Sequence, residues 1–229
     1  MLGTNRAKGE TVVENKCYAW VNLALLDLLP PKGGRVLDCG CGAGDNARVL
    51  RARGCSVMGI TKSESERDIA LSRCDGVLIH DLETGIPEEV GANYDVVLMS
   101  HVLEHLVNPE RVLTDARARL APGGLLAVAL PNVLTLHTRL SFLLGKFEYT
   151  ETGILDDTHV RFYTFDSGRR LLERCGYRVI LAQADGYAPL FGLQKILPRS
   201  WAAWLDRTSC RYWPGLLGRQ SLYLARPDR

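Results

Sequence analysis

Residues 36–47 read VLDCGCGAGDNA, and this stretch decides the fold. An apolar run ends at Asp38, three glycines alternate at Gly40, Gly42 and Gly44, and a helical pattern follows. Glycines allow the backbone to approach a ligand closely, and the first turn of a helix offers unpaired N–H groups. The stretch therefore predicts a strand, a glycine turn and a helix that together bind a ligand against the backbone.

Short apolar runs alternate with amphipathic segments on either side of this turn. The expected strands cover 35–38, 56–60, 76–79, 94–99, 124–130, 177–183 and 220–225, and the expected helices cover 12–29, 45–53, 63–72, 109–120 and 166–176. Ser63 with Glu66 predicts a capping box, and Asp166 is expected to cap its own helix. Strands that are almost wholly apolar predict an α/β fold, with a mostly parallel sheet covered by helices on both faces.

The chain is expected to form one domain, residues 1–229. Within it we expect an N-terminal helix in 1–32 and a cofactor-binding core in 33–132. A lid insertion is expected in 133–165, and 166–229 should complete the sheet with a second insertion at 185–218. Ligands of such sheets bind outside the carboxyl ends of the strands, where insertions can cover them.

The composition of the chain argues against disordered, nucleic-acid-binding, membrane-spanning and secreted classes of protein. With 46% hydrophobic residues, 24% charged residues and a net charge of +2, the chain is globular, and no binding to nucleic acid is expected. It has no uninterrupted apolar run of the length that a membrane span needs, and the N-terminal residues predict no secretory signal. Seven cysteines without a C-x-x-C pair predict reduced thiols and a cytoplasmic location.

Electrostatics helps to choose the ligand of the glycine turn. Residues 42–47 also satisfy the dinucleotide pattern G-x-G-x-x-A. However, Asp38 and Asp45 would repel a pyrophosphate, and the second strand ends at Thr61 rather than at an acidic residue. A positively charged ligand without phosphates therefore fits better. An NAD(P)-dependent oxidoreductase stays an alternative, because Thr61 and Lys62 could favour a phosphorylated ribose.

Four motifs resemble those of the class I S-adenosylmethionine-dependent methyltransferases over residues 33–184. They are D-x-G-x-G-x-G from Asp38, Asp81-Leu82, MSHVLEH at 99–105 and LAPGG at 120–124. The resemblance implies a Rossmann-like seven-stranded sheet with an antiparallel last strand, and S-adenosylmethionine as cosubstrate. It implies cofactor contacts at Asp38, Gly40, Cys41, Gly42, Gly44, Thr61, Asp81, Leu82, Ser100 and His101. The family usually has an acidic residue where Thr61 stands, and Lys62 or Glu64 could compensate.

A second group of candidate residues follows the fourth strand. If Ser100 caps a short helix, His101, Glu104 and His105 share one face of it. The string also matches the zinc-protease pattern H-x-x-E-H, but that motif does not belong after a Rossmann-like strand. No metal is therefore assigned.

Residues 155–164, LDDTHVRFYT, bring Asp156, Asp157, His159 and Arg161 together. With LEH and PN (131–132), this segment looks like that of small-molecule methyltransferases, including relatives of the methionine- and ubiquinone-biosynthesis types. RNA 2′-O-methyltransferases have a similar Glu-x-x-Glu-His set that binds magnesium. Because His101 replaces the first glutamate here, a divalent ion at Glu104, His105 and His159 is kept only as an alternative.

The resemblance implies methyl transfer to a small-molecule acceptor, and we expect a hydroxyl oxygen. Removal of its proton needs a base with a pKa near 7, for which His159 or His101 is expected, oriented by Glu104 or His105. A non-catalytic module that binds S-adenosylmethionine is a further alternative. The Trp- and Arg-rich stretch 191–216 could cap a substrate, contact a membrane, form a homodimer face or fold as buried lid helices.

Overall fold

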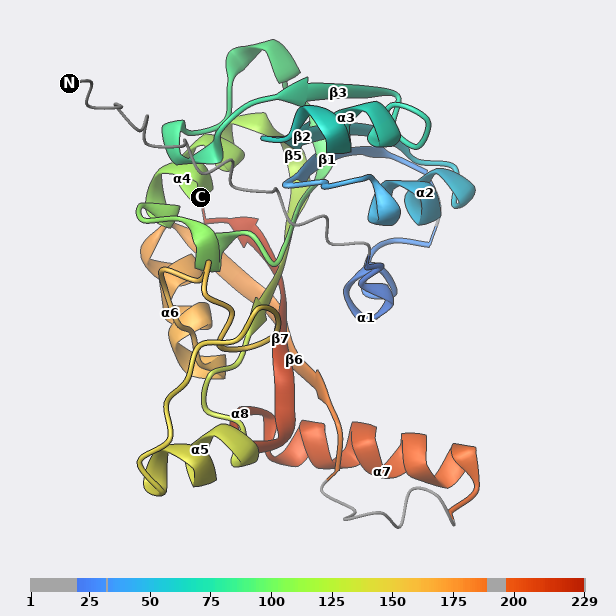
Figure 1. Cartoon of the computed structure of the whole chain (residues 1–229). Helices are drawn as coiled ribbons and strands as arrows, with labels where there is room; N and C mark the ends of the chain where they lie inside the picture. Colours follow the sequence, from blue (N-terminus) through green and yellow to red (C-terminus); the bar gives the residue numbers. More distant parts are fainter. Residues whose placement is uncertain (1–19, 32, 189–196, 229) are drawn as a thin grey trace, which may run out of the picture.

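A computed structural model describes residues 20–31, 33–188 and 197–228. Its sheet has the strand order β3-β2-β1-β4-β5-β7-β6 (Figure 1). The strands are β1 (Arg35–Cys39), β2 (Ser56–Thr61), β3 (Gly76–Ile79), β4 (Tyr94–Ser100), β5 (Leu120–Pro131), β6 (Tyr177–Gly186) and β7 (Gly218–Pro227). The first five in chain order pair in parallel, whereas β7 is antiparallel to both β5 and β6. The expected seven-stranded sheet with an antiparallel last strand is confirmed.

Helices cover both faces of this sheet. They are α1 (Leu23–Leu26), α2 (Asp45–Ala52), α3 (Glu64–Ala70), α4 (Pro109–Arg119), α5 (Leu136–Leu143), α6 (Phe165–Arg174), α7 (Arg199–Tyr212) and α8 (Pro214–Leu217), with short 3-10 turns η1 (Leu82–Thr84), η2 (Glu88–Val90) and η3 (Leu103–His105). Neighbouring residues of a strand point to opposite faces, so Val36 and Leu37 enter two separate apolar clusters. One cluster packs under α4 and α6, and the other under α1, α2 and α3.

The starts of three helices agree only in part with the sequence prediction. Within the described residues the N-terminal helix covers only Leu23–Leu26, because Asn22 caps it through a bond from the Leu25 N–H; positions 12–19 of the prediction lie outside the described residues. Helix α6 is capped by Thr164 in a reciprocal box with Ser167, so the expectation of an Asp166 cap was wrong. Ser63 does cap α3, but the side chain of Glu66 bonds elsewhere.

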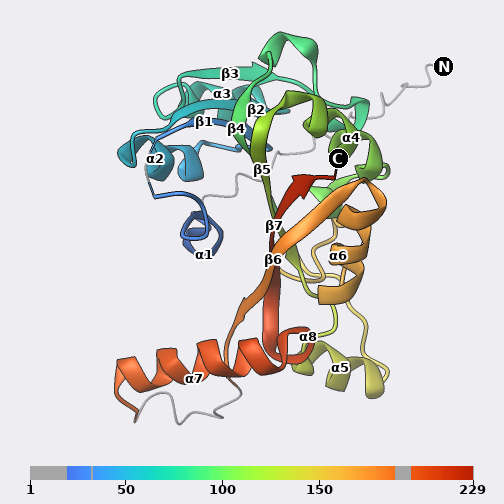
Figure 2. The ribbon, with the colours of Figure 1, turned by 180° about the vertical axis from the view of Figure 1, so that it is seen from behind.

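Both predicted insertions leave the same end of the sheet. Helix α5 follows β5, while α7 and α8 lie between β6 and β7, and Figures 1 and 2 show all three beyond the ends of these long strands. Trp201 and Trp204 on α7 are 65% and 57% exposed, so these two rings are not buried lid residues; positions 191–196 of the same stretch lie outside the described residues. In the described part of the chain, no helix has the length and apolar character that crossing a membrane requires.

Candidate functional site

The glycine turn between β1 and α2 is left-handed at each of its three glycines. Gly40, Gly42 and Gly44 have φ values of 75°, 52° and 80°, which residues with a side chain rarely adopt. A Cβ added to Gly40 would lie 2.6 Å from Val102 Cγ2. The backbone of this turn is therefore bare, and a ligand can approach its N–H groups and the first turn of α2.

Asp38 supplies an unsatisfied negative group beside this turn. Its side chain is buried, and Oδ2 has no hydrogen-bond partner in the described part of the chain. Burial raises the pKa of Asp38 to about 7. Asp45 differs, because Arg73 pairs with it at 2.6 Å and offsets its charge. The electrostatic preference for a cation therefore depends on Asp38, and a buried carboxylate oxygen without a partner fits the positively charged cofactor.

The end of β2 carries an acidic group that the sequence prediction missed. Thr61 Oγ1 donates a hydrogen bond to Glu66 Oε2 at 2.7 Å. Glu66 is the third residue of α3, and the Ser63 cap turns this helix back over the end of the strand. The Glu66 carboxylate thus lies at the end of β2, where the sequence analysis expected only the Thr61 hydroxyl. Lys62 and Glu64, the two residues considered as substitutes, are both exposed.

The other expected cofactor residues differ in where their side chains lie. Asp81 is exposed and caps η1 by accepting a bond from the Glu83 N–H, while Leu82 is buried in the larger apolar cluster. Cys41 packs beside Cys74 in the smaller apolar cluster. A hydrogen bond between the two thiols and the burial of Cys41 both raise the pKa of the Cys41 thiol. The thiol is thus a protonated core group, and a role of Cys41 toward the cofactor can involve only its backbone.

His101 follows β4 in a left-handed conformation, with φ of 56°. Ser100 belongs to the strand and η3 begins only at Leu103, so the expected helix capped by Ser100 was wrong. His101 Nδ1 lies 3.2 Å from Glu104 Oε1, and Nε2 lies 3.0 Å from Gln220 Oε1. Burial opposes protonation of His101, but the hydrogen bond and charge of Glu104 outweigh it and raise the pKa.

Gln220 decides the protonation of His101. Its amide N–H₂ donates to Asp185 Oδ2 at 2.8 Å, which turns Oε1 toward the imidazole, and the same Oε1 accepts a bond from Asn22. His101 therefore faces an acceptor on each ring nitrogen and must donate from both. An imidazole that donates from both nitrogens has no lone pair left to accept a proton, so this geometry favours another residue as the base.

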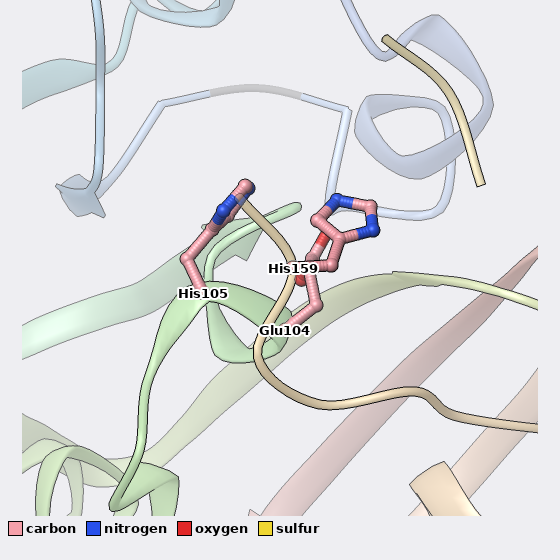
Figure 3. Close-up of side chains that lie close together, drawn as sticks. All are labelled: Glu104, His105 and His159. Carbon is pink, nitrogen blue, oxygen red and sulfur yellow. The ribbon is translucent and has the colours of Figure 1, made fainter. Parts of the chain in front are cut away.

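Glu104, His105 and His159 lie close together beside η3, as Figure 3 shows. One ligand atom from each residue lies within 4.8 Å of the other two, and the two imidazole rings meet edge to face at 4.8 Å. Burial lowers the pKa of His105 despite the nearby charge of Glu104. The three residues that the sequence analysis kept only as an alternative ion site thus lie together in the structure.

The loop before α6 is attached directly to η3. The N–H groups of Val160 and Arg161 both donate to the Glu104 carbonyl at 3.0 Å, and the Arg161 side chain bonds the Val107 carbonyl. Asp156 is buried and accepts bonds from Thr158, whereas Asp157 is exposed. Of the four residues picked out in this segment, His159 joins Glu104 and His105 in one group, called the η3 cluster below, and Arg161 anchors the loop to the chain after η3.

Comparison with known proteins agrees with this geometry. A model of the methyltransferase-domain family matches residues 13–182. The ubiquinone biosynthesis O-methyltransferase of Rhizobium etli is 36% identical over 107 residues, which are 45% of this chain and 43% of that protein. The protein of the same name from Dinoroseobacter shibae is 30% identical over 169 residues, 70% of this chain and 66% of that protein. This chain thus matches less than half the length of the Rhizobium relative.

Solved structures show the same fold. A SAM-dependent methyltransferase from Archaeoglobus fulgidus superposes with a TM-score of 0.63 over 89% of this chain and 90% of that chain, at 18% identity. The family match favours S-adenosylmethionine over a dinucleotide as the cosubstrate. The glycine turn and the unpaired Asp38 carboxylate oxygen are consistent with this choice. The chain therefore belongs to the class I S-adenosylmethionine-dependent methyltransferases, and S-adenosylmethionine is its cosubstrate.

Proposed function

We propose that this methyltransferase acts on a hydroxyl oxygen of a small molecule, with His159 as general base. The observation that carries the proposal is the environment of His159, whose Nδ1 lies 3.1 Å from the Ile154 carbonyl. A backbone carbonyl only accepts, so Nδ1 carries the proton and Nε2 keeps its lone pair. The names of the relatives from Rhizobium and Dinoroseobacter, both O-methyltransferases, support an oxygen acceptor.

The cofactor is proposed to lie along the carboxyl ends of β1 and β2. There the backbone of the glycine turn would hold its methionine part, and Asp38 would pair with the positively charged ammonium of that part, which S-adenosylhomocysteine also carries. Glu66 would bind the ribose hydroxyls in place of an acidic residue at Thr61, since a carboxylate accepts two such bonds. Asp81 and Leu82 would lie by the adenine. When bound, S-adenosylmethionine supplies a methyl group activated by the positive charge of its sulfur.

His159 is a better base than His101 for a physical reason. A hydroxyl acceptor must lose its proton as the new bond forms, and a neutral imidazole removes it efficiently near pH 7. His101 faces acceptors on both nitrogens, whereas His159 keeps one nitrogen open. Glu104 and His105 would orient His159 and stabilise the imidazolium that forms. His101 would keep the Glu104 carboxylate in place from the other side.

The segments 133–165 and 185–218 are proposed to form the lid over the acceptor. The first carries His159, and both leave the end of the sheet where the cofactor is expected. A lid of this kind excludes water while the acceptor is aligned behind the methyl group. A homodimer, a cytoplasmic location and the absence of nucleic-acid substrates stay predictions.

The proposal is tested by the site of methylation. The protein is incubated with methyl-labelled S-adenosylmethionine and a panel of phenols, catechols and sugars, and products are identified by mass spectrometry and NMR. We expect methyl ethers as the products. Methylation confined to nitrogen or carbon acceptors would refute the oxygen assignment.

A further inference from the structure

Glu104 has a carboxylate oxygen without a partner in the middle of the η3 cluster. The side chain is fully buried, Oε1 faces His101, and Oε2 has no hydrogen-bond partner in the described residues. A buried carboxylate oxygen left unsatisfied costs free energy, because it has lost its water without gaining a donor or a cation. The ligand atoms of His105 and His159 lie within 4.8 Å of this carboxylate (Figure 3).

Both histidines are held in the tautomer that leaves Nε2 as an acceptor. His105 Nδ1 lies 3.3 Å from the Thr158 carbonyl and 3.1 Å from Thr158 Oγ1, whose own hydrogen is donated to Asp156 Oδ1. His159 Nδ1 lies 3.1 Å from the Ile154 carbonyl. Each imidazole thus donates from Nδ1 and keeps its Nε2 lone pair. The cluster therefore contains three atoms with free electron pairs, the two Nε2 atoms and Glu104 Oε2, and no hydrogen that could bridge them. A ligating histidine is usually held in this way, with its second nitrogen donating to a backbone carbonyl or a carboxylate.

We propose that Glu104, His105 and His159 bind one divalent first-row transition-metal ion through one carboxylate oxygen and both Nε2 atoms. Two imidazoles and one carboxylate suit Zn²⁺, Mn²⁺ or Fe²⁺, whereas Mg²⁺ prefers oxygen ligands. Ligand atoms bind such ions at about 2.0–2.2 Å, so the ion would draw the three atoms closer together by about 1 Å. Backbone hydrogen bonds join the loop that carries His159 to the Glu104 carbonyl, so the loop and η3 already hold these ligands close to each other.

Ion binding has a consequence for the proposed reaction. The Nε2 lone pair that would accept the proton of the acceptor hydroxyl is the one that would bind the ion. The ion and the proton therefore compete, and the metal-loaded protein should methylate more slowly until a chelator removes the ion. This consequence rests on the proposed function, while the binding itself does not.

The binding is tested on full-length, tag-free protein that has been treated with a chelator. Calorimetric titration with Zn²⁺, Mn²⁺ and Mg²⁺ is expected to show one ion per chain, with Zn²⁺ bound most tightly and Mg²⁺ most weakly. His105→Gln and Glu104→Gln should each weaken Zn²⁺ binding by at least about 10-fold. His137→Gln is the matched control, since this histidine is exposed on α5 and should leave the affinity unchanged.

A second readout guards against a variant that fails to fold. Co²⁺ added to the wild-type protein should produce a visible absorption band from bound cobalt that Zn²⁺ abolishes, whereas the His105 variant should lack this band while keeping the wild-type circular dichroism. Absence of a stoichiometric Zn²⁺ site, or equal affinity in wild type and both ligand variants, would overturn the metal proposal. If the ion binds but leaves the rate unchanged or raises it, the role of His159 as base fails and the metal site stands.

Discussion

Replacing Asp38 by asparagine should stabilise the free protein and weaken its binding of the cofactor. Burial disfavours the charged form of Asp38 and raises its pKa from 3.8 to about 7 in the folded protein. A group whose folded pKa is raised contributes stability that is present below its unfolded pKa and is lost as the pH rises through the folded pKa. In the wild type, the ionised carboxylate therefore lowers the free energy of unfolding most above pH 7.

The size of this effect follows from the two pKa values. Their separation of about 3 units, at 1.36 kcal/mol per unit, makes Asp38→Asn more stable than wild type by about 4 kcal/mol at pH 8 and by about 2 kcal/mol at pH 5. Asparagine keeps the size of the side chain and removes its charge. Urea denaturation of the cofactor-free protein at the two pH values measures both differences.

Cofactor binding should change in the opposite direction. A hydrogen bond to a charged group is worth about 1.5–3 kcal/mol, so Asp38→Asn should weaken the binding of S-adenosylhomocysteine about 10- to 100-fold at pH 8. Below pH 7 the wild type must also release the proton of Asp38, so its affinity should fall with decreasing pH while that of the variant stays level. Isothermal titration calorimetry at pH 6 and pH 8 measures both effects.

Asp45→Asn serves as the control, because Asp45 is already paired with Arg73. Loss of this ion pair should lower the stability slightly and leave the affinity for S-adenosylhomocysteine close to that of the wild type. If Asp38→Asn gains no stability at pH 8 and binds S-adenosylhomocysteine as tightly as the wild type, Asp38 is neither the strained buried charge nor the group that meets the cofactor.

Three other substitutions test the rest of the site. Glu66→Gln should weaken S-adenosylhomocysteine binding about 10-fold through the ribose, with the exposed Glu64→Gln as its matched control in calorimetry; equal affinities would remove Glu66 from the site. His159→Gln should lower kcat about 10²- to 10⁴-fold while cofactor affinity is retained, and a near-normal kcat would exclude it as base. Gly40→Ala should abolish cofactor binding and lower the thermal midpoint, because its Cβ would meet Val102 at 2.6 Å in a left-handed turn, and wild-type binding would contradict this account of the turn.

The sequence analysis anticipated the sheet because its signals are local. Apolar runs of strand length and the glycines at 40, 42 and 44 are patterns of neighbouring residues. The strands and the glycine turn formed as expected, and the structure shows that the turn is left-handed at all three glycines. Helix ends were less accurate, because side chains compete for the same N–H groups. Thr164 caps α6 in place of Asp166. Its hydroxyl accepts a hydrogen bond from the Ser167 N–H, and the Ser167 hydroxyl accepts one from the Thr164 N–H.

The site depended on contacts that sequence spacing did not reveal. Glu66 was missed as a candidate cofactor group because it reaches Thr61 only after Ser63 has turned α3 back over β2. A signal was present, since a capped first turn places its third residue beside the strand that precedes it. His101 was expected as a possible base, but Gln220, 119 residues away, occupies its second nitrogen.

The parallel sheet, the bare glycine turn and the Asp38 carboxylate at the end of β1 could be predicted from the amino-acid sequence. These features follow from backbone conformation and side-chain polarity over a few neighbouring residues. The folded chain was needed to see which histidine has a nitrogen without an acceptor beside it and which carboxylate lies by Thr61. Protonation depends on the partners that surround a buried group, and the folded chain brings those partners from distant positions.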